Sequence, residues 1–148
     1  MRAVVTRVKH ASVTIDGAET ARIGQGFLIL LGIAPTDSPA LSTKLAEKIL
    51  SLRVFEDENG KMNRSLADCN GQVLVVSQFT LYADCKHGRR PSFTGAAGPQ
   101  IAIPLYEHFL QECARLGFPA QHGEFGADMK VDSLNDGPVT LLLDTDSL

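Results

Sequence analysis

The chain has 148 residues, a net charge of −3, 44% hydrophobic residues and 21% charged residues. This length suffices for one domain with its own core, and the composition excludes a disordered or membrane-spanning chain. Because the balance is acidic, any nucleic-acid binding must come from a local basic patch. The N-terminal stretch is strand-like and has no secretory h-region, so we expect a single cytoplasmic domain over residues 1–148 with no membrane partner.

The three cysteines and four histidines give no metal or disulfide pattern. The cysteines form no CxxC pair, and the histidines show neither HxH nor HxxxH spacing. Odd, widely spaced cysteines are typical of a reducing compartment. We therefore expect free thiols, no zinc site and no cofactor.

The first third of the chain predicts strands. Residues 2–8 and 11–15 have strand-like patterns, and the pair Asp16-Gly17 predicts a hairpin turn because it tolerates positive φ. The run FLILLGI, residues 27–33, is apolar throughout. It predicts a strand that is buried on both faces.

A helix is predicted next, with Ser38 as its N-cap and Pro39 in its first turn. Apolar residues then recur at helical spacing and define one buried face: Leu41, Leu45, Ile49 and Leu52. The pair Asn59-Gly60 predicts a further turn.

The second half predicts a central strand over residues 72–83, followed by a polar loop. A second helix is expected over residues 101–116, with Gly117 as its C-cap and with Pro104 as its start or a kink. Residues 126–145 predict two strands around a turn. The chain should therefore be an α+β domain, with a mostly antiparallel, barrel-like sheet and two packed helices.

Three polar side chains interrupt the predicted central strand: Ser77, Gln78 and Thr80. If the strand continued, Ser77 and Phe79 would point to one face, and Gln78 and Thr80 to the other. An unpaired buried polar group costs about 1–3 kcal/mol. Either these groups satisfy loop backbone at a strand end, or they contact a ligand.

A nucleophilic role for Ser77 or Thr80 is a further alternative. It requires a base, usually a histidine oriented by an aspartate. The sequence has no G-x-S-x-G elbow and no adjacent histidine, although the fold could supply one.

The segment Asn135-Asp136-Gly137-Pro138 interrupts the last apolar stretch. One interpretation is a turn, because proline cannot donate to a sheet ladder. Alternatively, a ligand can approach the backbone of Gly137 closely. A cis Gly137-Pro138 bond, which costs only about 0.5–1 kcal/mol, would then point neighbouring carbonyls at that ligand.

A cluster of cations lies in the stretch KHGRRPSF: Lys86, Arg89 and Arg90. Such a cluster is either a solvated loop or a phosphate-binding site, since arginine forks match phosphate geometry.

In this order, the stretches SQFTLYAD, GRRPSF, FGADM and NDGPVT resemble the D-aminoacyl-tRNA deacylase family. The N-terminal RAVVTRVKHASVTIDG and the stretch GQGFLILLGI are also similar, so the resemblance covers essentially the whole chain. It implies a carboxylic ester hydrolase of translation proofreading. The implied reaction releases D-amino acids, and mischarged glycine, from tRNA.

The resemblance also implies a homodimer with active sites at the subunit interface. The family's SQxT motif matches the implied catalytic residues Ser77, Gln78, Phe79 and Thr80. The implied substrate-binding residues are Asn135, Gly137, Pro138 and Thr140 of the NxGPxT motif, Met129 of FGADM, and Arg7, which orients the dipeptide. The cis Gly-Pro dipeptide is inserted into the partner's site, and Lys86, Arg89 and Arg90 are the expected RNA-binding residues.

On this resemblance, Ser77 and Gln78 hold the ester carbonyl oxygen as it gains charge. Thr80 is a positioning hydroxyl or a nucleophile, and the family is read as using the tRNA's 2′-hydroxyl or a water. Carbonyls near Gly137 and Pro138 hold the substrate's ammonium, so an L side chain clashes and glycine passes. Two rival classes stay open: an esterase with a Ser or Thr nucleophile, and a non-catalytic RNA-binding dimer.

Overall fold

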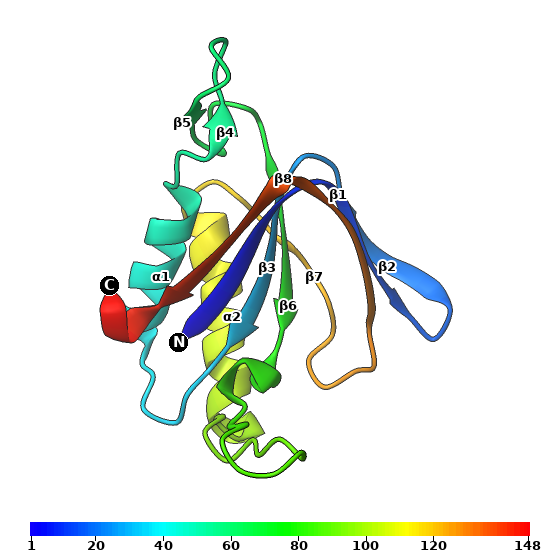
Figure 1. Cartoon of the computed structure of the whole chain (residues 1–148), viewed down its shortest axis with the longest axis vertical. Coiled ribbons are helices and arrows are strands. Elements are labelled where there is room, and N and C mark those ends of the chain that lie inside the picture. Colours follow the sequence, from blue (N-terminus) through cyan, green and yellow to red (C-terminus); the bar gives the residue numbers. More distant parts are fainter.

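The computed structural model describes all 148 residues and has a curled sheet with two helices packed on one side (Figure 1). Its strands are β1 (Arg2–Ile15), β2 (Ala18–Ile23), β3 (Gly26–Gly32), β4 (Phe55–Glu56), β5 (Met62–Arg64), β6 (Gln72–Ser77), β7 (Gln121–His122) and β8 (Lys130–Asp144). Its helices are α1 (Pro39–Leu50) and α2 (Pro99–Arg115), with 3₁₀ turns η1 (Phe79–Tyr82) and η2 (Thr145–Ser147). The α+β class is confirmed. Neither α-helix is long and apolar enough to cross a bilayer.

The strand β1 organises the sheet, because it pairs antiparallel with β2, β3 and β8. The strand order is β2-β1-β3-β6-β7, and β8 pairs with β1 off this path. The β3–β6 and β6–β7 pairs are parallel, so the sheet is mixed. Because β2 also contacts β6 and β7, the sheet curls into a nearly closed barrel.

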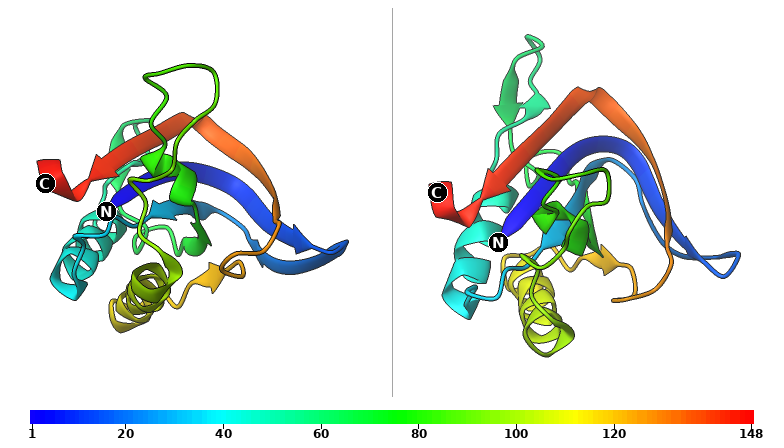
Figure 2. Two further views of the ribbon diagram at one scale, coloured as in Figure 1. Left: turned by 90° about the horizontal axis from the view of Figure 1, so that it is seen from below. Right: turned by 60° about the horizontal axis from the view of Figure 1, so that its bottom comes forward.

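Two predicted strand boundaries are wrong for the same reason. The segments 2–8 and 11–15 are one strand, because pairing with β8 continues across the region where separate strands were expected. The last two strands are likewise one strand, β8, which runs alongside β1 in both views of Figure 2. The segment that was expected to be a turn, residues 135–138, instead lies at a bulge within β8, in which residues 136–139 have no ladder partners.

The core lies on both faces of the sheet. One cluster fills the space between sheet and helices and includes Phe27, Ile29, Leu31, Leu45, Ile49, Val75 and Phe109. A second cluster lies inside the curl of the sheet and includes Val8, Val13, Ile23, Leu28, Leu74 and Val76. The neighbouring strands β3 and β6 contribute to both clusters, which confirms that the FLILLGI strand is buried on both faces.

Local signals set most element boundaries. Ser38 Oγ accepts a hydrogen bond from the Leu41 N–H at 3.4 Å, and Pro39 is the first residue of α1. The Asp16-Gly17 turn has φ values of 50° and 78°, as a type I′ hairpin requires.

The second helix differs from its prediction at both ends. It begins at Pro99 and runs through the exposed Pro104, so Pro104 is not its start. The C-cap is Leu116, and Gly117 follows it with φ +96°. The Phe118 N–H donates to the Cys113 carbonyl at 2.8 Å, which closes a Schellman motif.

Candidate active site

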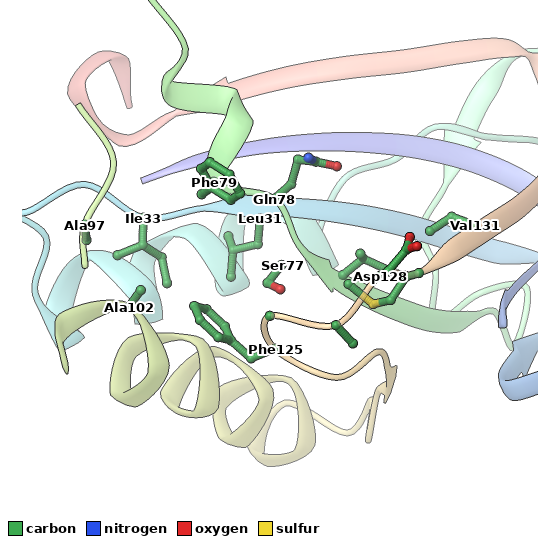
Figure 3. A pocket seen from close by; sticks show the side chains of 14 residues that line it. Leu31, Ile33, Ser77, Gln78, Phe79, Ala97, Ala102, Phe125, Asp128 and Val131 are labelled. Atoms are coloured by element: carbon green, nitrogen blue, oxygen red, sulfur yellow. The ribbon is translucent and has the colours of Figure 1, made fainter. Parts of the chain in front are cut away.

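A cavity of about 270 Å³ opens at the end of β6 (Figure 3). Its mostly hydrophobic lining consists of Leu31, Ile33, Val76, Ser77, Gln78, Phe79, Ala97, Ala102, Phe125, Gly126, Ala127, Asp128, Met129 and Val131. Mainly apolar cavities with a few convergent polar groups are typical ligand sites. The cavity therefore contains three of the four SQxT residues, together with Met129.

The polar motif sits where β6 ends, which corrects the prediction of a strand through residue 83. Ser77 pairs with Leu31 as the last residue of β6, and the Gln78 N–H donates to the Leu31 carbonyl at 2.8 Å. The chain then turns into η1, which packs against Gly32. A Cβ on Gly32 would lie 3.0 Å from Leu81 Cβ, so the absence of a side chain there makes room for the turn. The predicted alternation of faces therefore stops at Ser77.

The polar side chains of this motif have different surroundings. The Ser77 hydroxyl points into the cavity and makes no hydrogen bond within the chain (Figure 3). The Gln78 amide Nε2 donates to Thr80 Oγ1. Thr80 is exposed and does not line the cavity. Thr80 therefore orients the Gln78 amide, which has a second N–H free to donate.

No acid–base pair accompanies these groups. No histidine lines the cavity, and Asp128 is its one carboxylate. The Asp128 side chain is 84% exposed and lies 3.0 Å from Lys130 Nζ. The fold therefore brings no histidine base to the cavity that Ser77 lines.

The cavity walls include residues that the sequence did not single out individually. Phe125 packs against Tyr106, with ring centroids 6.0 Å apart, and the Tyr106 hydroxyl donates to the Val75 carbonyl at 3.1 Å. Burial raises the pKa of Tyr106 to about 12, so this donor stays protonated at neutral pH. A Cβ on Gly123 would lie 2.3 Å from Met129 Sδ, so that glycine leaves room for Met129. The stretch FGADM pointed to this wall, although only Met129 was assigned a role.

The turn η1 is tied to the outer ends of β1 and β8 through Arg2. Its Nη1 donates to the Leu81 carbonyl at 3.1 Å, and its guanidinium lies 4.5 Å from the centre of the Tyr82 ring. Its Nε donates to Asp144 at 2.8 Å. Burial tends to raise the pKa of Asp144, but the hydrogen bonds from Arg2 and from the Asp146 N–H lower it below its ordinary value.

The NxGPxT motif forms the bulge in β8. Thr6 pairs with Thr140 and Val8 with Asn135, which leaves residues 136–139 without ladder partners. The Asn135 amide donates to Thr140 Oγ1 at 2.9 Å, and its Oδ1 accepts from the Val139 N–H at 3.0 Å. These two side chains therefore brace the neck of the bulge.

The tip of the bulge is exposed, and the Gly137-Pro138 peptide bond is cis. Gly137 has φ +141°, where L side chains are rarely found. A Cβ there would lie 2.7 Å from Val139 Cγ2 and 3.1 Å from Arg7 Nη2. Only glycine fits this position without displacing a neighbour.

Arg7 holds the bulge from beneath, with a side chain that is only 4% exposed. Its Nε donates to the Asp136 carbonyl at 2.8 Å, and its Nη1 donates to the Val54 carbonyl at 2.5 Å. The Asp136 carboxylate lies 3.7 Å away and the Glu56 carboxylate 4.0 Å away. Arg7 thus links the bulge to the β4–β5 hairpin.

Within one chain the two motifs do not meet. Ser77 pairs with Leu31, which in turn pairs with Ala3. Gly137 has no ladder partner but lies beside the Arg7 side chain, between the Thr6 and Val8 pairs. Four residues along β1 and three strand spacings correspond to about 13 Å and about 14 Å. The cavity lining accordingly includes no residue between Lys130 and Asp144 except Val131.

The basic loop, residues 85–91, is closed at its neck. Asp84 and Ser92 exchange backbone hydrogen bonds of 2.7 and 2.9 Å. The three predicted RNA-binding cations, Lys86, Arg89 and Arg90, are exposed, and none is in an ion pair. The loop therefore presents three free positive charges on an acidic protein.

The comparison with protein families decides among the classes that the geometry leaves open. The family model described as D-Tyr-tRNA(Tyr) deacylase matches residues 4–144. The chain belongs to the D-Tyr-tRNA(Tyr) deacylase family. Its hydrolase class follows from that family.

Relatives within this family are similar over their whole length. A D-aminoacyl-tRNA deacylase of Thermosipho africanus is 54% identical over 145 residues, which are 98% of this chain and 97% of the relative. One of Lacticaseibacillus casei is 56% identical over 147 residues, or 99% of each chain. The solved structure of a c-Myc DNA Unwinding Element Binding Protein has a TM-score of 0.92 and 42% identity, covering 97% of this chain and 98% of that one.

Proposed function

We propose that this chain is a D-aminoacyl-tRNA deacylase that hydrolyses the ester between a D-amino acid and the tRNA 3′ end. The observation that carries this proposal is the cavity at the end of β6, whose mostly apolar lining holds an unpaired Ser77 hydroxyl next to Gln78, whose amide is oriented by Thr80. Relatives that bear the deacylase name are more than half identical to this chain over nearly its full length. A tRNA substrate also fits the expected cytoplasmic location.

The chemistry needs positioning and charge stabilisation more than an acid–base pair. An aminoacyl ester is already activated, so the main barrier is the charge that develops on its carbonyl oxygen. The Ser77 O–H and the free Gln78 N–H donate to that oxygen, and Thr80 keeps the amide in place. The attacking group is the 2′-hydroxyl of the terminal adenosine or a water beside it, because no histidine lines the cavity and its one carboxylate, Asp128, is exposed and paired with Lys130.

We further propose that the active unit is a homodimer in which each cavity receives the partner's bulge. The bulge is braced, exposed and remote from the cavity of its own chain, which supports a role in a second chain. Exposed apolar side chains on β8 are consistent with a covered face, since Leu142 is 71% exposed and Leu134 is 52% exposed.

In this arrangement the bulge enforces chirality. The carbonyls of Gly137 and Pro138 accept hydrogen bonds from the substrate ammonium, while Ser77 and Gln78 hold the ester. With both ends fixed, the α-hydrogen and the side chain can only exchange places. A D side chain points outward, an L side chain meets backbone, and glycine passes because it has no side chain.

The decisive assay compares D-Tyr-tRNA, L-Tyr-tRNA and Gly-tRNA as substrates of the purified protein. We expect release of D-tyrosine and glycine and retention of L-tyrosine. Equal cleavage of both tyrosine enantiomers would overturn the chirality mechanism. A covalent acyl-enzyme that is lost in Thr80→Ala would favour the esterase, and tRNA binding without cleavage would favour the RNA-binding dimer.

The shared site has a separate test. Gln78→Ala and Pro138→Ala should each inactivate their own homodimers. After subunit exchange, a mixture should regain part of the activity, because one site of each heterodimer combines an intact Gln78 with an intact Pro138. Demonstrated exchange without recovery, or a fully active monomer, would refute the shared site.

A further inference from the structure

Two exposed aromatic rings stand in contact at the mouth of the cavity. Phe79 and Phe93 lie edge to face, with ring centroids 5.1 Å apart and ring planes at 76°. Phe79 lines the cavity and is 57% exposed, whereas Phe93 lies outside it and is 38% exposed. Large apolar side chains in mutual contact are seldom left open to water unless a ligand or partner covers them.

The Phe93 ring is presented by a fixed piece of backbone. On its N-terminal side, Ser92 is bridged to Asp84 by two hydrogen bonds. On its C-terminal side, the Ala96 N–H donates to the Phe93 carbonyl at 3.1 Å, and the Ala97 N–H donates to the Ile33 carbonyl at 2.9 Å. Because both flanks are anchored, little conformational entropy is lost when a ligand contacts the ring.

The surroundings favour an anionic strand over a protein partner. Ser92 joins Phe93 to the basic loop, whose cations form no ion pair. From the cavity outward, the chain thus presents ester-binding groups, then an aromatic pair, then positive charge. A single-stranded nucleic acid can bind this surface with one nucleoside in the cavity, the next base stacked on an aromatic ring and its phosphates at the cations.

We propose that Phe79 and Phe93 form a stacking platform for the penultimate nucleotide of the tRNA 3′ end. The inference rests on the proposed function, since it places the terminal nucleoside in the cavity beside Ser77. Stacking does not depend on hydrogen bonds to the base, because every base has a π face. The platform therefore suits any tRNA. It also fixes the distance between the double-stranded part of the tRNA and the reacting ester at its 3′ end.

The test measures kcat/KM on three D-tyrosyl esters: of adenosine, of the dinucleotide CpA, and of the same dinucleotide with an abasic residue in place of cytidine. In the wild type, the cytidine base should raise kcat/KM by about 5- to 150-fold over the abasic substrate, the range that corresponds to one stacked base. Phe93→Ala should abolish that gain and leave the rate on D-tyrosyl-adenosine unchanged. Phe93→Trp should preserve it.

Phe93 is varied because Phe79 lines the cavity itself. Met62→Ala is the control, because Met62 is a still more exposed apolar residue on the β4–β5 hairpin, and this variant should keep the full gain. Equal rates on the cytidine and abasic substrates in the wild type, or a full gain in Phe93→Ala, would overturn the platform. So would an equal loss of rate on all three esters in Phe93→Ala, or a change in its sedimentation that reveals a contact between chains. If the wild type cleaves none of the three esters and no D-Tyr-tRNA, the proposed function itself has failed.

Discussion

Replacing Gly137 by alanine tests how the bulge is held. The new Cβ would lie 2.7 Å from Val139 Cγ2, 2.9 Å from the Val139 nitrogen and 3.1 Å from Arg7 Nη2. A residue other than glycine at φ +141° costs about 1–3 kcal/mol in backbone strain. Disturbing one hydrogen bond from a charged group adds about 1.5–3 kcal/mol. We therefore expect Gly137→Ala to lower the free energy of unfolding by about 2.5–6 kcal/mol.

The matched control is Gly60→Ala. Gly60 has φ +73°, and a Cβ added to it would have no neighbour within 4 Å, so only the backbone cost of about 1–2 kcal/mol applies. Urea unfolding measures the free energy of unfolding of both variants. In a thermal melt, each kcal/mol lost should lower Tm by about 2–4 °C for a chain of this size. Deacylation of D-Tyr-tRNA by Gly137→Ala should fall by about 10²-fold, because a misplacement near 1 Å has that effect. Equal destabilisation of the two variants would show that the Cβ displaces nothing and would refute the steric account.

Three further predictions concern other parts of the molecule. Thr80→Ala should slow deacylation by no more than about 10³-fold, as for loss of an oxyanion donor; a loss near 10⁶-fold with unchanged tRNA binding would indicate a covalent nucleophile instead. Replacing Arg89 and Arg90 together by alanine should weaken tRNA binding. The slope of the logarithm of the binding constant against the logarithm of the salt concentration should become shallower by about 0.7–0.9 per lost phosphate contact. An equal loss of activity on D-tyrosyl-adenosine would assign these arginines to the fold or the chemistry. The pKa of Asp144 lies below its ordinary value of 3.8, so its pairing with Arg2 stabilises the fold fully above that pH and less as pH falls through the lowered pKa. Asp144→Asn should thus lower the free energy of unfolding at neutral pH and make it depend less on pH in acid. If urea unfolding shows that the variant and the wild type lose stability in parallel down to about pH 2, this linkage is contradicted.

The sequence predicted those features that depend on neighbouring residues. The Ser38 cap and the Asp16-Gly17 turn follow from hydrogen bonds and φ preferences within a few residues, and both occur where expected. The interruption at Ser77 and Gln78 also located the cavity, because polar groups next to a core strand need a partner or a ligand.

Features that depend on distant segments were not predictable in the same way. The strand β6 ends at Ser77 because its partner β3 ends beside it and Gly32 admits η1, neither of which is visible in the motif itself. The opposite wall of the cavity comes from Phe125, nearly fifty residues later in the chain. The sequence predicts a turn where the bulge lies, because the pairing of β8 along β1 depends on long-range register.

The pairing of β1 with β8 also sets how the molecule responds to mechanical force. Arg2 pairs with Asp144 and Thr14 with Lys130, so the two strands run antiparallel and their outer ends lie side by side. A load that separates Arg2 from Asp144 acts across the ladder and peels it one hydrogen-bonded pair at a time, instead of shearing all pairs together. The bulge divides this ladder into two segments, and the pairs between Arg2 and Thr6 open before the peeling reaches it. Tension applied at these ends therefore first opens the pairs between Arg2 and Thr6, the part of the ladder to which η1 is attached through Arg2. The hydrogen bond from Arg7 to Asp136 then resists the opening of the bulge.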